Sequence, residues 1–255
     1  MTPHAYLLGA AFVLSACATP TAASDWQPLF DGETLSGWTP KIVGEAAGED
    51  RRALFRAKDG VLHVSYDNVQ TFDGDFGHLF YNIPAAHYRL RFEYQFTGAQ
   101  VSGGPGWALM NSGVMVHAQA PETMTLDQPF PISIEAQLLG LPETLPERTT
   151  ANICTPGTHF VQNDEITTQH CVNSDTPAIA PDTWVKFEIE VRGDAYIQLN
   201  IDGAPAYRLE QPQYDGTDPD VQRLGLSGPL AAGYFALQAE SHPAAFRNIE
   251  WQLLD

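Results

Sequence analysis

The chain has 255 residues, of which 44% are hydrophobic and 17% charged, a composition typical of a folded globular protein. Lys and Arg number 13 against 31 Asp and Glu, so the formal net charge is −18. Such a surface repels phosphate backbones, so we expect no nucleic-acid partner, and neutral sugars or bound cations suit it better.

The first 16 residues have the pattern of a secretory signal peptide. An apolar run from Ala5 to Leu14 is too short for a permanent membrane helix. It leads into Leu14-Ser15-Ala16-Cys17, which resembles a bacterial lipoprotein box. We expect Cys17 to carry the lipid, residues 17–25 to form a tether, and the lipid to be the protein's membrane contact. An ordinary signal cleaved near Ala23 is the alternative, because no Lys or Arg precedes the apolar run.

The residue after Cys17 bears on where such a lipoprotein would reside. It is Ala18, not the Asp that often retains lipoproteins at the inner membrane. We therefore expect an exported protein, anchored in the bacterial cell envelope at the outer membrane and facing the periplasm or the cell surface.

Residues 26–255 show two-residue periodicity punctuated by Pro, Gly, Asn and Asp, which predicts short β-strands joined by turns. No stretch keeps a helical period for three turns, and no internal repeat is found. The expected strands cover residues 60–66, 88–96, 112–119, 131–140, 184–193, 195–203, 233–241 and 246–254. Gly193-Asp194 and the segment 200–203 predict hairpin turns. This pattern indicates an all-β fold, a single antiparallel β-sandwich of the jelly-roll type.

Two cysteines lie in the mature chain, Cys154 and Cys171. In an exported protein an isolated pair most often forms a disulfide, which here would close a polar loop. A metal-binding role for the two thiols is the less favoured alternative.

Polar side chains alternate with apolar ones on several expected strands and could converge on one sheet face. Glu135 and Gln137 share a face of their strand, as do Gln238, Glu240 and His242 near the end of the chain. His117 lies beyond "NSGV", and His159 lies in the loop between the two cysteines. A second such face carries Arg89, Arg91, Glu93 and Gln95.

Periodicity alone leaves alternatives for these residues. Glu135 is either solvated or lines a cleft, and Glu240 either opposes Glu135 as half of an acid–base pair or pairs with Arg247 or another basic residue. The histidines with either carboxylate could bind a divalent metal of unknown identity.

Two further features have both a ligand-binding and a structural interpretation. "YDGTDPD", residues 214–220, is either a calcium loop or a plain acidic turn. Trp107 follows a glycine-rich turn and could stack on a sugar. The other tryptophans, Trp26, Trp38, Trp184 and Trp251, are expected in the core.

Five segments, in order, resemble one protein family. They are "WQPLFDGETLSGW" (26–38), "NSGVMVH" (111–117), "IEAQLL" (134–139), "WVKFEIEVRGDAYIQLNIDG" (184–203) and "GYFALQAESHPAAFRNIEW" (233–251). Together they are similar to the 3-keto-disaccharide hydrolase domain, a concanavalin A-like jelly roll, and the resemblance covers residues 26–255. The segment around Cys154 and Cys171 is less typical of the family.

The resemblance implies an enzyme that cleaves 3-keto-glycosides, as a hydrolase or as a β-eliminating lyase. Glu135, in the family's Glu-x-Gln motif, would be the base and Glu240 the acid. A hydrogen-bond donor for the enolate would come from His117, His242 or a bound ion. Gln137, Gln238, His242, Trp107 and His159 would bind the carbohydrate.

A non-catalytic, lectin-like sugar-binding lipoprotein is the alternative, because the same fold serves both functions.

Overall fold

The structure is a computed structural model that describes Met1 and residues 25–255. The predicted signal peptide, the lipidation site Cys17 and the tether up to residue 24 lie outside the described residues and stay predictions. In the part that is described, no helix is long and apolar enough to cross a membrane.

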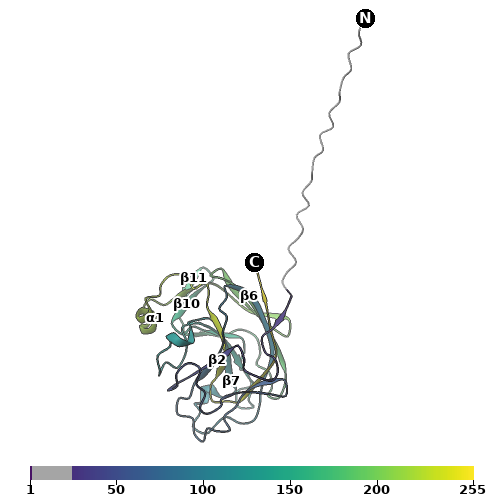
Figure 1. The fold of residues 1–255 in the computed structure, drawn as a ribbon, viewed down its shortest axis with the longest axis vertical. Helices are drawn as coiled ribbons and strands as arrows, with labels where there is room; N and C mark the ends of the chain where they lie inside the picture. Colours follow the sequence, from purple (N-terminus) through teal and green to yellow (C-terminus); the bar gives the residue numbers. More distant parts are fainter. Residues whose placement is uncertain (2–24) are drawn as a thin grey trace.

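Two antiparallel sheets pack face to face (Figure 1). The larger has ten strands, in the spatial order β11 (Glu165–Thr167), β10 (Thr158–Gln162), β15 (Ala204–Tyr214), β14 (Tyr196–Ile201), β13 (Val185–Arg192), β6 (His87–Phe96), β17 (Ala244–Leu253), β4 (Val61–Val64) and β3 (Phe55–Lys58), with β1 (Gln27–Pro28) beside β17. The smaller has seven strands, in the order β12 (Cys171–Val172), β9 (Asn152–Cys154), β8 (Ile134–Leu139), β7 (Asn111–Ala118), β16 (Tyr234–Ala239), β5 (Gly77–Tyr81) and β2 (Trp38–Ile42).

Helical structure in the described residues is confined to single turns. These are η1 (Gly106–Ala108), η2 (Pro121–Thr123) and α1 (Pro219–Leu224). Asp218 caps α1, since its carboxylate accepts hydrogen bonds from two backbone N–H groups of the first turn.

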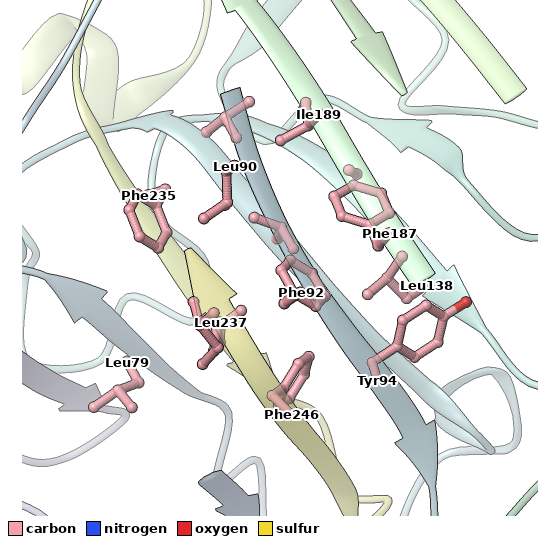
Figure 2. Close-up of a cluster of buried hydrophobic side chains, with 14 of the residues drawn as sticks. Leu79, Leu90, Phe92, Tyr94, Leu138, Phe187, Ile189, Phe235, Leu237 and Phe246 are labelled. Carbon is pink, nitrogen blue, oxygen red and sulfur yellow. The ribbon is translucent and has the colours of Figure 1, made fainter. Parts of the chain in front are cut away.

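The core lies between the two sheets and explains why alternating sequences form these strands (Figure 2). On β6, Leu90, Phe92 and Tyr94 point inward, and the polar residues between them point outward. Phe92 packs against Phe187 of β13, with ring centroids 5.0 Å apart. From the opposite sheet, Leu237 and Phe235 of β16 and Leu138 of β8 complete the packing. Burial of this apolar area is the main stabilising contribution to the fold.

The predicted antiparallel jelly-roll sandwich is confirmed. Both predicted hairpins form, one between β13 and β14 and one between β14 and β15. In the second hairpin Asp202 and Gly203 both have positive φ (49° and 82°), as a two-residue turn with the twist of its strands requires.

One segment differs from the sequence-based expectation. The loop between Cys154 and Cys171 was expected to be irregular, but it contains β10 and β11, which extend the ten-stranded sheet. At the end of the chain the two expected strands form, and they lie in different sheets. The chain leaves β16, passes His242 and Pro243, and enters β17 on the other sheet.

The core prediction for the tryptophans is correct for Trp38 and Trp251, which are buried. It is wrong for Trp26 and Trp184, because each lies half-buried against an arginine on the outer side of the ten-stranded sheet. Their guanidinium partners, Arg91 and Arg247, sit 4.0 Å from the ring centroids.

The second polar face predicted from the sequence forms the outer surface of the ten-stranded sheet. Arg89, Arg91 and Arg247 pair there with Glu190, Glu250 and Glu93. Arg247 is therefore the partner of Glu93, and the alternative that Arg247 pairs with Glu240 is wrong.

Candidate active site

Strand β8 brings Glu135 and Gln137 to one face of the seven-stranded sheet. Ile134, Ala136 and Leu138 pack into the core between the sheets. Because side chains alternate along a strand, Glu135 and Gln137 point away from that core. The same alternation on β16 sends Leu237 inward and directs Gln238 and Glu240 to the same face as Glu135.

Gly113 allows side chains of β8 and β16 to meet across the strand between them. A Cβ atom at this position would lie 2.7 Å from Glu135 Oε1 and 3.2 Å from Gln238 Oε1. The side-chain amide of Gln238 donates to Glu240 Oε1 at 3.4 Å and lies close enough to Glu135 to lower the pKa of that carboxyl. The amide of Gln238 therefore adjoins both carboxyls predicted from the sequence.

A cavity of about 510 Å³ opens over these residues. It is lined by Glu135, Gln137 and Glu240 together with Trp107, Asn111, Phe130, Leu139, Arg148, Asn152, Cys154, Pro156, His170, Cys171 and Asn173. The predicted disulfide between Cys154 and Cys171 is confirmed and forms part of the cavity wall. Strand β9 places Cys154 directly beside Glu135 in the sheet.

Burial raises the pKa of both carboxyls. Glu135 is 5% exposed and its pKa rises to about 8, mainly because burial penalises the charged form. The pKa of Glu240 is raised well above its usual range, first by burial and then by the charge of Glu135, and Arg148 opposes this shift. Two buried carboxyls this close favour a state in which one is ionised and the other keeps its proton, which is the ionisation state of a base beside an acid.

Several buried polar atoms on this face have no hydrogen-bond partner among the described residues. Among them are Glu135 Oε1, Gln238 Oε1, Glu240 Oε2 and Asn111 Oδ1. Buried polar groups are almost always satisfied in native proteins, and each exception calls for an explanation. A polar ligand bound in the cavity would supply the missing partners.

Arg148 is a cavity residue that the sequence analysis missed. Its Nη1 donates to the carbonyl oxygens of Leu109 and Gly140, and its Nη2 donates to that of Trp107 at 3.2 Å. A guanidinium has five N–H donors, so these three bonds leave two for a ligand. No strand periodicity marks Arg148, because it lies in a loop between β8 and β9.

Asn152 was also missed, although its strand neighbour Gln137 was found. Its amide donates to Gln137 Oε1 at 3.3 Å, and Ser174 donates its backbone N–H to Asn152 Oδ1. The strand that carries it, β9, has three residues, too few for an alternating pattern to appear.

The prediction for His117 does not fit its position. A bulge in β7 opposite β16 adds one residue and reverses the alternation, and His117 has a positive φ of 51° there. The ring is 2% exposed, contacts the carbonyl of Gly193 at 3.0 Å, and lines a different cavity of about 340 Å³. The structure therefore does not bring His117 to Glu135 and Glu240.

The three other residues predicted to bind the carbohydrate, Trp107, His242 and His159, lie in three different parts of the structure. Trp107 is 55% exposed and lies at the cavity, where its ring stacks on Phe76. His242 is buried against Phe96 and does not line the cavity. His159 faces Asp215 at 3.5 Å in a neighbouring pocket.

The histidine and carboxylate donors proposed for a metal are consequently not brought together. In residues 25–255, no group of three or more His, Cys, Asp or Glu is arranged to hold a metal ion. The acidic segment 214–220 also serves other purposes, because Asp215 accepts hydrogen bonds from Thr217 and Asp218 caps α1. This geometry favours the acidic turn over the calcium loop.

The sequence matches the 3-keto-alpha-glucoside-1,2-lyase-like domain over residues 25–252. The fold is similar to a "putative glycosyl hydrolase" of Parabacteroides distasonis ATCC 8503, with a TM-score of 0.55 and 16% identity over 90% of this chain and 100% of that one. A second "putative glycosyl hydrolase" of that organism has a TM-score of 0.52 and 19% identity over 90% and 94% of the two chains.

A Bacillus subtilis protein of unknown function with a galectin-like fold has a TM-score of 0.54 and 12% identity, over 91% of this chain and 96% of that one. Because the sequence identities are this low, these three similarities show only that the proteins share a fold. A search of curated proteins found no match.

Proposed function

We propose that this chain, which belongs to the 3-keto-alpha-glucoside-1,2-lyase-like domain family, is a carbohydrate-active enzyme that cleaves 3-keto-glycosides by elimination. The observation that carries the proposal is the pair Glu135 and Glu240, two buried carboxyls that line one cavity and have raised pKa values. A ketone at C3 of a sugar makes the proton on C2 acidic. The reaction therefore needs a base to remove that proton and an acid to protonate the leaving oxygen.

In the first step, ionised Glu135 takes the proton from C2 and the electron pair forms an enolate with the oxygen at C3. Arg148 has two uncommitted N–H donors at the cavity wall, and we assign to it the stabilisation of this oxygen. An arginine suits this role because its charge does not depend on pH in the working range.

In the second step, the enolate collapses, a double bond forms between C1 and C2, and the C1–O bond breaks. Protonated Glu240 gives its proton to the departing oxygen. Water can then add at C1, losing a proton to Glu240, while Glu135 returns a proton to C2. This addition reverses the elimination and restores both carboxyls, so the same pair supports a lyase and a net hydrolase outcome.

The remaining polar residues would hold the sugar. Gln137 and Asn152 form an amide pair on one wall, and Trp107 offers an exposed ring at the entrance. Amides suit sugar hydroxyls because they donate and accept, and an aromatic face suits the C–H side of a sugar ring.

The experiment compares a 3-keto-glucoside with its unoxidised parent in D₂O. The elimination route requires release of the C1 group from the ketone alone and loss of the C2 proton: C2 carries no hydrogen in a lyase product and carries deuterium in a hydrolysis product. Glu135→Gln should lower turnover by about 10²- to 10⁴-fold while circular dichroism shows an unchanged fold. Equal turnover of the two substrates, or retention of the C2 proton, would count against the proposal.

The lectin-like alternative has one observation in its favour, the exposed ring of Trp107. A lectin has no need for two buried carboxyls with raised pKa values, because ionised carboxylates accept hydrogen bonds from sugar hydroxyls equally well. Glycan binding that survives Glu135→Gln, with no turnover of any 3-keto-glycoside, would favour this function.

A further inference from the structure

A second pocket adjoins the candidate active site and shares part of its wall. This pocket has a volume of about 360 Å³, and three residues, Phe130, Pro156 and His170, line both spaces. Since the same side chains border the two spaces, a substrate too long for the active-site cavity would extend past them into the second pocket.

The junction between the two spaces carries an aromatic wall. The ring of Phe130 lies 5.0 Å from that of Phe76, and Phe76 stacks on Trp107 with an interplanar angle of 13°. The wall therefore runs from the active-site cavity to the second pocket. Together with Pro156 it offers a surface suited to a flat, apolar group.

The far side of the second pocket is acidic. Asp215, Asp218 and Asp220 line it, and neither Lys nor Arg is among its lining residues. Arg223 pairs with Asp220 at 2.9 Å, whereas Asp215 faces only His159 across 3.5 Å. With no lysine or arginine lining the pocket, the carboxylates of Asp215 and Asp218 leave this side negatively charged.

The disulfide-closed segment 154–171 joins the two spaces. It supplies Pro156 and His170 to both and His159 to the second pocket, and the bond between Cys154 and Cys171 fixes its base beside Glu135.

We propose that the second pocket is the aglycone subsite: it takes an aromatic group attached to C1 of the sugar and discriminates against negative charge on that group. The inference rests on the proposed function, because the sugar must occupy the cavity of Glu135 and Glu240 for its C1 substituent to reach Phe130. The shared border of Phe130, Pro156 and His170 and the aromatic wall assign the aromatic group, and the acidic side sets the charge preference.

The test compares two 3-keto-glucosides of similar shape, one with a 4-(trimethylammonio)phenyl aglycone and one with a 4-carboxyphenyl aglycone. The measured quantity is the ratio of their kcat/KM values. Wild type should favour the cation, and Asp215→Asn should reduce the ratio by about tenfold, since it removes one charge near the substituent. Comparing one ratio between two proteins cancels the different leaving abilities of the two phenols.

Asp215→Asn is a mild change, because asparagine keeps an oxygen that can accept the hydrogen bonds from Thr217. Asp67→Asn is the matched control: Asp67 is an exposed carboxylate that lines neither space, so its loss should leave the ratio unchanged. Turnover of the methyl 3-keto-glucoside should be the same in all three proteins, since a methyl group does not reach the second pocket.

Two outcomes separate this inference from the proposed function. Turnover of both aryl substrates with the same ratio in wild type and Asp215→Asn overturns the aglycone subsite and leaves the elimination standing. If no 3-keto-glycoside is turned over, calorimetric binding of the two unoxidised aryl glucosides decides the inference. A cation preference that Asp215→Asn weakens supports it, and equal binding of the two overturns it.

Discussion

Glu135 and Gln238 come from strands that are not neighbours, and their side chains meet because the residue between them, Gly113, has no side chain. Gln238 also donates to Glu240, so the glycine is what permits one amide to adjoin both the acid and the base. The candidate active site depends on this missing side chain as much as on the two carboxyls.

Gly113→Ala should therefore lower activity without unfolding the protein. The new Cβ would lie 2.7 Å from Glu135 Oε1 and 3.0 Å from its Cγ, so the carboxyl must move. A displacement of about 1 Å at a reacting group can cost about 10²-fold in rate. The measurement is kcat for methyl 3-keto-glucoside, with Gly216→Ala as control, since a Cβ there meets nothing within 4 Å. Wild-type kcat in Gly113→Ala would show that the contact has no catalytic role.

Activity should rise with pH through the ionisation of Glu135. The pKa of this carboxyl is about 8, so below that value most molecules carry the base in its protonated, inactive form. The rate should increase about tenfold per pH unit up to about pH 8 and fall again where Glu240 ionises. A profile of kcat/KM from pH 5 to 10 tests this. A rate that falls steadily above pH 5 would contradict the assignment of Glu135 as the base.

The same raised pKa should make stability depend on pH. The folded-state pKa of Glu135 lies above its ordinary value of 4.5, so the folded state holds this proton more tightly than the unfolded state. The free energy of unfolding is therefore greatest below about pH 4.5 and falls as pH rises toward 8, by at most about 1.4 kcal/mol per pH unit from this group.

Glu135→Gln removes this dependence, because glutamine does not titrate. Its Tm should exceed that of wild type by more at pH 8 than at pH 5. Parallel changes in Tm for the two proteins across that range would mean that Glu135 is not buried as described.

Removal of the disulfide should affect both stability and activity. The bond closes a segment with a sequence separation of 17, for which the loss of chain entropy in the unfolded state is worth about 3 kcal/mol. The double variant Cys154→Ser with Cys171→Ser should have a lower Tm, which thermal unfolding without reductant would measure. Since both residues line the active-site cavity, kcat/KM should fall as well. Unchanged kcat/KM at a temperature where the variant is folded would show that the wall does not shape the site.

The lipid anchor stays a prediction that the sequence alone supports. If Cys17 is the lipidated residue, full-length protein expressed in a Gram-negative host should incorporate labelled palmitate and fractionate with the outer membrane, and Cys17→Ser should do neither. Release of an unlabelled soluble protein cleaved near Ala23 would instead support an ordinary signal peptide.

By itself, the sequence determined the fold class and the carboxyl pair. Alternation of apolar and polar residues on β6, β8 and β16 reflects the pleat of a strand, which is local, so it also identified which face carries Glu135, Gln137, Gln238 and Glu240. Only the tertiary structure decided what else joins them. Arg148 and Asn152 reach the cavity through a loop and a three-residue strand, which have no periodicity to detect.

Two histidines show where a prediction from local alternation fails. A one-residue bulge, set by pairing with β16, turned His117 away from the site, and a hairpin that joins the other sheet carried His159 into the neighbouring pocket. Such pairings depend on residues far apart in the chain, so alternation within one strand could not predict them.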